Sequence, residues 1–145
     1  MNSLVKFSEE IRLVFEQNKD HIDLPFFYSF PVNSCESSAC IHGVFLKDKF
    51  PNIKIEVLHG YNEDNDENHY WLEIDGLVFD ITCDQFDGVS MPIYGYLTHP
   101  MSDYFNHVER FTIIDFVINY LDAVVDVEVF SRNKSNIKKW LGVNT

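Results

Sequence analysis

The sequence predicts an α+β fold in which two helices come first and antiparallel strands follow. Apolar residues recur at helical spacing over residues 4–15 and again over residues 34–50. Two later apolar segments flank Asp75-Gly76, and this dipeptide is among the strongest short signals for a β-hairpin. Helical periodicity early in the chain and a hairpin signal in its middle therefore give the fold class.

The second predicted helix, over residues 34–50, carries the clearest start and stop signals. Asn33 is a good N-cap residue, and Glu36 follows three positions later, as in a capping box. Pro51 ends the helix because a proline disfavours helical backbone in the residue before it. Gly43 costs stability inside a helix, so it indicates a close approach to a neighbouring segment.

Strands are predicted over residues 53–58, 70–74 and 77–82, because apolar and polar residues alternate there. The acidic run over residues 62–68 is expected to be a solvated loop. It lacks the internal glycine and the terminal glutamate of a calcium-binding loop.

The C-terminal third is less informative. A further strand is predicted over residues 91–97, and residues 111–125 fit either a buried helix or strands. A short helix is expected over residues 136–141. No linker or repeat divides the chain, so residues 1–145 are expected to form one domain.

Composition narrows the classes of partner and compartment. The 23 acidic and 11 basic residues give a formal charge of −12, which argues against nucleic acid and anionic membranes as partners. Residues 1–18 carry charges at close intervals and do not resemble a signal peptide. Three cysteines suit a reduced compartment, so we expect a cytoplasmic protein, with delivery as an effector or toxin left open.

Three residues have the chemistry of a nucleophile, its base and the base's orienter: Cys35, His69 and Asp80. A free cysteine is mostly protonated at neutral pH because its pKa is about 8.5, and the thiolate is the nucleophile. Cys35 lies in the first turn of the predicted helix, where unpaired N–H groups and the helix dipole favour an anion. The same N–H groups can donate to the oxyanion of a tetrahedral intermediate.

The Asp75-Gly76 turn supplies a geometric test of this trio. A two-residue turn pairs His69 with Thr82, which makes Asp80 a diagonal neighbour of His69 with backbones roughly 7–8 Å apart. Because successive side chains of a strand point to opposite faces, one face of the hairpin carries His69, Trp71, Glu73, Val78, Asp80 and Thr82. The other face is apolar, and we expect the polar face to meet the helix of Cys35.

These motifs resemble transglutaminase-like cysteine hydrolases of the papain-like superfamily. The resemblance covers residues 30–86 and rests on Asn-Ser-Cys-Glu-Ser-Ser, Asn-His-Tyr-Trp-Leu-Glu and Phe-Asp-Ile-Thr-Cys-Asp-Gln-Phe. It implies that Cys35 is the nucleophile, His69 the general base and acid, and Asp80 the orienter. It also implies a core in which the nucleophile begins a helix packed on an antiparallel sheet. Cys83 stands where the family pattern has a small residue.

Four further residues are candidates for oxyanion binding or support of the site: Asn33, Ser34, Trp71 and Gln85. Asn33 is also explained by capping alone, and Trp71 and Gln85 by packing alone. Cys40 and Cys83 are expected to be core residues.

His42 and His59 are alternative bases, but neither has a carboxylate placed beside it as clearly as Asp80 lies beside His69. The remaining histidines, His21, His99 and His107, lie in segments without a motif and are expected to be surface or structural residues. A zinc site built from Cys35, Cys40, His42 and His69 has poor ligand spacing, so no metal or cofactor is expected.

The sequence therefore predicts acyl transfer through a thioester on Cys35, acting on a protein, peptide or amide substrate. Peptide hydrolysis by a cysteine protease, amide hydrolysis, glutamine deamidation and transamidation share this intermediate, and the sequence leaves them and the oligomeric state open. The alternative is a binding or regulatory domain that retains the fold without turnover.

Overall fold

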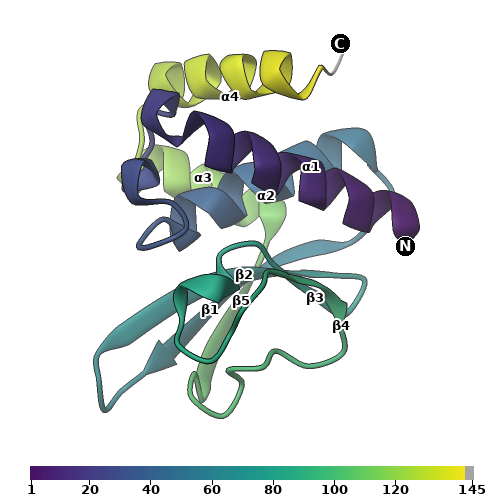
Figure 1. Cartoon of the computed structure of the whole chain (residues 1–145). Helices are drawn as coiled ribbons and strands as arrows, with labels where there is room; N and C mark the ends of the chain where they lie inside the picture. The colour runs from purple at the N-terminus through teal and green to yellow at the C-terminus, as the bar shows by residue number, and fades with distance from the viewer. Residues whose placement is uncertain (143–145) are drawn as a thin grey trace.

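Four α-helices lie on one side of a five-stranded antiparallel sheet in the computed structural model, which describes residues 1–142 (Figure 1). The helices are α1 (Asn2–Asn18), α2 (Cys35–Lys49), α3 (Ile113–Ala123) and α4 (Val127–Leu141). The strands are β1 (Ile55–Asn62), β2 (Glu67–Ile74), β3 (Leu77–Asp80), β4 (Ile93–Tyr96) and β5 (His107–Thr112), in the spatial order β4-β3-β2-β1-β5. The predicted α+β class is confirmed.

The β2–β3 hairpin has the predicted register. Ile74 lies opposite Leu77, and the two turn residues Asp75 and Gly76 have φ values of 48° and 84°. Positive φ at both central residues is the requirement of a type I′ turn, which glycine and aspartate meet at low cost. The acidic run differs from its prediction, because Asn62 and Glu67 pair at the ends of β1 and β2, and only residues 63–66 form the turn.

The start of α2 does not follow the predicted capping box. Ser34 is the N-cap and its side chain makes no capping bond, while Asn33 has a φ of 61°. The N–H of Asn33 donates instead to Gln85 Oε1 at 3.2 Å. The predicted cap at Asn33 is therefore wrong, because a contact with a distant segment sets the chain direction before the helix.

The prediction that the polar face of the hairpin meets the cysteine helix is also wrong. Leu72, Ile74 and Phe79 on the apolar face share one hydrophobic core with Ile41 and Phe45 of α2. Apolar burial is the larger driving force, so the apolar face receives the helices. The His69 face is covered instead by the connection between β3 and β5, which contains β4 and several aromatic residues.

The C-terminal third contains a strand that the sequence does not predict, and this strand is followed by the helices α3 and α4. Residues 107–112 form β5, which pairs with β1 at an exposed sheet edge, and α3 follows directly with Thr112 as its N-cap. The helix predicted over residues 136–141 extends over the whole of α4, which packs on α1 away from the sheet (Figure 1). Within residues 1–142, no helix has the length and apolar content that crossing a membrane requires.

Two glycines make close approaches of different kinds. A Cβ added at Gly60 in β1 would lie 2.7 Å from two ring atoms of Trp71 and 2.8 Å from the Cβ of Phe105. A Cβ added at Gly43 in α2 would lie 2.5 Å from Cδ1 of Ile113, the tip of a flexible side chain. The close approach predicted at Gly43 is confirmed, and Gly60 is the more rigid of the two contacts.

Gly60→Ala is expected to destabilise the protein by about 1–3 kcal/mol, because the aromatic rings and backbone around it have no room to move. Gly43→Ala is the matched control, since Ile113 can rotate and alanine favours a helix by about 1 kcal/mol relative to glycine. Urea unfolding of both variants measures the difference. Equal losses for the two substitutions would contradict this account of the packing.

Candidate active site

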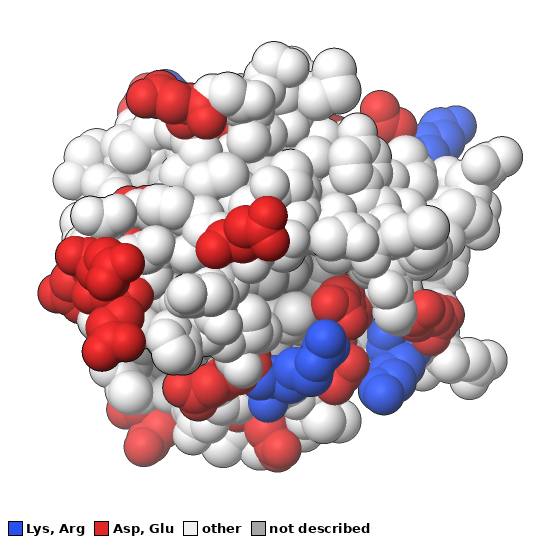
Figure 2. All heavy atoms as spheres, turned by 90° about the horizontal axis from the view of Figure 1, so that it is seen from below, with Lys and Arg blue, Asp and Glu red and all other residues white. Residues whose placement is uncertain are grey.

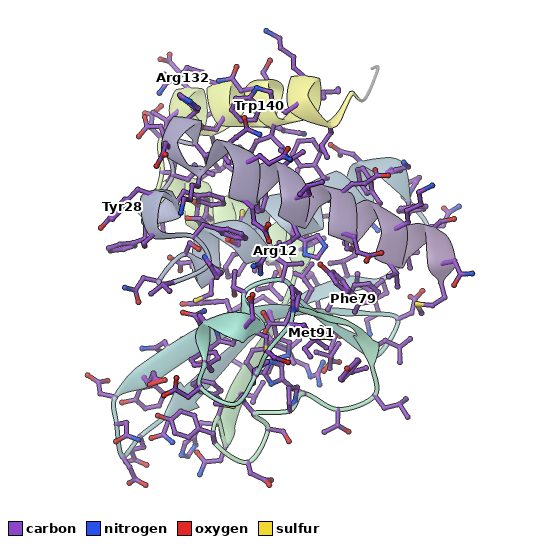
Figure 3. All side chains as sticks on the ribbon, in the orientation of Figure 1. Arg12, Tyr28, Phe79, Met91, Arg132 and Trp140 are labelled. Carbon is purple, nitrogen blue, oxygen red and sulfur yellow. The ribbon has the colours of Figure 1, made fainter. Side chains whose placement is uncertain are left out.

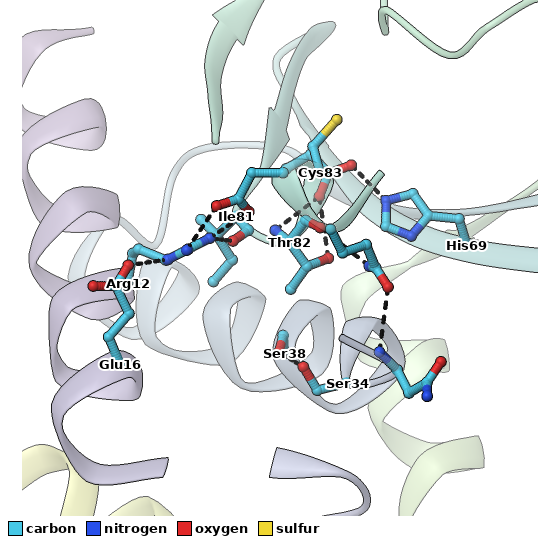
Figure 4. A network of polar contacts seen from close by, with 12 residues as sticks. Arg12, Glu16, Ser34, Ser38, His69, Ile81, Thr82 and Cys83 are labelled. Carbon is cyan, nitrogen blue, oxygen red and sulfur yellow. Dashed lines mark hydrogen bonds and ion pairs between the residues drawn. The ribbon is translucent and has the colours of Figure 1, made fainter. Parts of the chain in front are cut away.

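His69 and Asp80 form a buried pair across the β2–β3 hairpin. Nε2 of His69 lies 2.6 Å from Oδ2 of Asp80, and both side chains are almost completely excluded from solvent. Oδ1 of Asp80 accepts hydrogen bonds from the N–H of Thr82 at 3.0 Å and from its hydroxyl at 3.3 Å. The diagonal contact predicted from the Asp75-Gly76 turn is confirmed (Figure 4).

The pair is charged despite its burial. Burial alone would raise the pKa of Asp80, but the charge and hydrogen bond of His69, together with a bond from His99, hold that pKa well below its ordinary value. Burial would likewise lower the pKa of His69, but Asp80, and after it Cys35, raise that pKa to about 10. The hairpin therefore holds an imidazolium beside a carboxylate at neutral pH.

Cys35 is the first residue of α2 and is half-buried. It lines a cleft too narrow to hold a water molecule, together with Asp80 and Thr82. Nδ1 of His69 is buried and has no hydrogen-bond partner among residues 1–142, while Nε2 is occupied by Asp80. Nδ1 is therefore the ring nitrogen available to the Cys35 thiol, whose proximity also raises the pKa of His69.

The helix start leaves backbone donors beside the thiol. The side chain of the N-cap residue Ser34 makes no capping bond to the N–H groups of the first turn of α2. The Ser34 hydroxyl is buried and accepts a long hydrogen bond of 3.5 Å from the hydroxyl of Ser38. The helix start thus offers an oxyanion backbone N–H donors, and the Ser34 hydroxyl, which accepts from Ser38, still has its own proton to donate.

The predicted supporting residues take different positions. Gln85 bridges two segments, because its Oε1 accepts from the N–H of Asn33 and its Nε2 donates to the carbonyl of Thr82 at 3.1 Å. The side chain of Asn33 is exposed, and its backbone makes the contact. Trp71 is buried beside His69, with ring centroids 5.7 Å apart, and so excludes water from the pair.

His99 belongs to the site although no sequence motif indicates a role for it. Its Nε2 lies 2.7 Å from Oδ2 of Asp80, the same oxygen that contacts His69. For His99 the sequence predicts either a surface or a structural residue. Its burial shows that it is not a surface residue. No local motif marks it, because its contact depends on how the connection between β3 and β5 folds over the sheet.

His69, Asp80 and His99 together resemble a metal-binding set, since one ligand atom from each lies within 4.8 Å of the others. The position of the ring proton on His99 argues against metal binding by these three residues. Nδ1 of His99 accepts the N–H of Met101 at 2.9 Å, so the ring proton must lie on Nε2. A protonated Nε2 has no lone pair for a metal ion, and instead it donates a hydrogen bond to Asp80.

The remaining cysteines and histidines lie outside the pair. Burial raises the pKa of Cys40 to about 12 and also raises the pKa of Cys83, so both thiols stay protonated as expected of core residues. His42 is buried, with Nε2 2.8 Å from the Ser8 hydroxyl, and His59 contacts Asn68. Among the described residues, the group with metal-binding geometry contains His69 but not Cys35, Cys40 or His42, the other zinc ligands considered from the sequence.

Arg12 of α1 fixes the segment that follows Asp80. Its guanidinium makes two bonds to the carboxylate of Asp84, at 2.7 and 2.8 Å, and a further bond to the carbonyl of Ile81. Figure 3 places Arg12 between α1 and the sheet, and Figure 4 shows the bonds. Arg12 and Gln85 thus tie both α1 and the start of α2 to the residues just after Asp80.

Comparison of the chain with protein-family models, with curated proteins and with solved structures finds no match in any of the three.

Arg12→Met is expected to cost about 3 kcal/mol of stability, because it leaves the carboxylate of Asp84 nearly buried and unpaired. The double variant Arg12→Met with Asp84→Leu is the control, and it is expected to recover part of the loss. Urea unfolding measures both. A double variant that is less stable than the single one would contradict this role for the pair.

His42 is expected to make the protein sensitive to acid. Burial lowers the pKa of His42 from 6.5 to about 3, so between these values the unfolded chain binds a proton that the folded protein does not. Stability then falls with decreasing pH by up to about 1.4 kcal/mol per pH unit. His42→Gln removes this contribution, so the variant should lose less stability than the native protein between pH 7 and pH 5. Identical losses in urea unfolding would show that His42 is not buried in its neutral form.

Proposed function

We propose that the protein is a cysteine-dependent acyl-transfer enzyme that forms a thioester on Cys35. One observation carries the proposal: within residues 1–142 the buried His69–Asp80 pair leaves a single ring nitrogen free, and that nitrogen is available to a thiol at a helix start. An imidazolium beside a thiol favours the thiolate, which is the nucleophile.

In the proposed reaction the Cys35 thiolate attacks the carbonyl carbon of an amide. The oxyanion that forms accepts hydrogen bonds from backbone N–H groups in the first turn of α2. Nδ1–H of His69 then protonates the departing nitrogen, and the C–N bond breaks to leave a thioester. Water or an amine attacks the thioester while His69 takes its proton, which releases the acyl product and restores the thiolate.

The proposed relationship is to transglutaminase-like hydrolases with a papain-like core. Three features support it: Cys35 begins a helix, this helix packs on an antiparallel sheet, and His69 and Asp80 lie on neighbouring strands. The alternative proposal is a binding or regulatory domain that keeps this fold without turnover. A buried charged pair is costly to form unless its charge is used, so the enzyme is the better-supported proposal.

Surface charge bears on the class of substrate. Acidic side chains are spread over the face seen from below, and the basic side chains there gather next to acidic ones (Figure 2). With a formal charge of −12, the protein repels polyanions. We therefore propose neutral or basic peptides and amides as substrates, rather than nucleic acid or an anionic membrane.

Alkylation by iodoacetamide at pH 6, read residue by residue by mass spectrometry, tests the nucleophile. Cys35 is expected to react while Cys40 and Cys83 do not, because both of these are buried. His69→Ala should slow Cys35 about a hundredfold at this pH, since a thiol without an imidazolium partner is almost wholly protonated there. Asp80→Asn, which keeps the shape of the side chain, should slow the alkylation of Cys35 as well. If all three thiols react alike, or only after unfolding, the proposal fails.

The products of a substrate screen separate the possible reactions. Short peptides and primary amides are incubated with the protein, and Cys35→Ala is the control. A new peptide amino terminus indicates cleavage, ammonia without an added amine indicates deamidation, and ammonia with a new amide indicates transamidation. No product that depends on Cys35, from a protein whose Cys35 reacts at pH 6, would favour the binding-domain alternative.

A further inference from the structure

Two imidazoles meet at one carboxylate oxygen in the core of this protein. Oδ2 of Asp80 is 2.6 Å from Nε2 of His69 and 2.7 Å from Nε2 of His99, while Oδ1 accepts both bonds from Thr82. The side chain of His99 is only 3% exposed. The mechanism proposed above uses His69 and leaves His99 without a role.

The state of His99 follows from its second hydrogen bond. The N–H of Met101 can only donate, so Nδ1 of His99 must be unprotonated, and its single ring proton lies on Nε2. His99 is thus a neutral imidazole that donates to Asp80. It supplies a hydrogen bond without adding a charge that would compete with His69.

We propose that His99 is a positioning residue of the Cys35 site, whose neutral Nε2–H holds the Asp80 carboxylate in the orientation that binds His69. This inference rests on the proposed function. A carboxylate out of water needs its lone pairs occupied to stay ionised, and His99 provides one of its four hydrogen bonds. Asp80 then stays charged, and its charge keeps His69 protonated and aimed at the thiol.

Packing supports this assignment. The His99 ring lies 4.4 Å from the ring of Trp71, centroid to centroid, and 5.9 Å from that of His69. The Cys83 sulfur is 3.8 Å from Nε2 of His99. These neighbours fix the ring plane, so that the imidazole points its N–H at one oxygen.

Several titratable groups surround Asp80 and contribute to any pH dependence of the site. They come from β2, from the connection between β3 and β5, and from α2, and are His69, His99, Cys83, His42 and Cys35. Burial raises the pKa of Cys83 and lowers that of His42, so these two stay neutral near pH 7. The charges of Asp80 and His69 are then the ones that act on the Cys35 site near pH 7.

Two conservative substitutions separate positioning from packing. The longer side chain in His99→Gln carries an amide N–H to about the place of Nε2, so it can still donate to Asp80. The shorter one in His99→Asn can accept the N–H of Met101 in place of Nδ1, but it ends before Asp80. Both variants are compared with the native protein by the rate of iodoacetamide alkylation of Cys35 between pH 4 and pH 9.

The acidic limb of this pH profile is expected to move upward by about one pH unit in His99→Asn, which loses one hydrogen bond to a charged group. It should stay in place in His99→Gln. If the limb is unchanged in both variants, or moves equally in both, the positioning role is wrong. Protection of Cys40 and Cys83 from alkylation shows that each variant is folded, and His99→Phe replaces His99→Asn if the latter is not. Native Cys35 without reactivity at low pH would overturn the proposed function itself, a result distinct from an unchanged limb.

Discussion

The ionised carboxylate of Asp80 is the group on which the rest of this site depends. A carboxylate in an apolar core is costly unless hydrogen bonds and an opposite charge compensate it. Here four hydrogen bonds converge on its two oxygens, and the imidazolium of His69 supplies the charge. The position of His69 and the availability of its Nδ1 follow from this one buried charge, and the role proposed for Cys35 depends on it.

Much of the remaining structure holds Asp80 and Cys35 at a fixed separation. Arg12 secures the residues after Asp80 to α1, and Gln85 secures them to the chain just before Cys35. The helices cover the apolar face of the sheet, so the start of α2 reaches the end of β3 from that side. Aromatic rings from the connection between β3 and β5 close the opposite face over His69.

Features set by local sequence could be predicted, and features set by distant contacts could not. The Asp75-Gly76 turn needs positive φ at both positions, which fixes the hairpin register and with it the contact between His69 and Asp80. The N-cap predicted at Asn33, by contrast, is wrong, because the N–H of Asn33 donates a hydrogen bond to Gln85, fifty-two residues away in the sequence. His99 and Arg12 lie 19 and 72 residues from their partners Asp80 and Asp84, so no periodicity or motif could have indicated them. The prediction of which hairpin face meets the helices is also wrong, because the face opposite His69 and Asp80 offers the larger apolar area for burial.

The protonation state of His69 tests the central claim most directly. Nitrogen-15 NMR of histidine-labelled protein distinguishes an imidazolium, with both ring nitrogens protonated, from a neutral ring. With the pKa of His69 raised to about 10, both of its ring nitrogens should remain protonated at pH 8, where an ordinary histidine is neutral. A neutral His69 at pH 8, titrating near the ordinary value of about 6.5, would contradict the charged pair and the thiolate chemistry that rests on it.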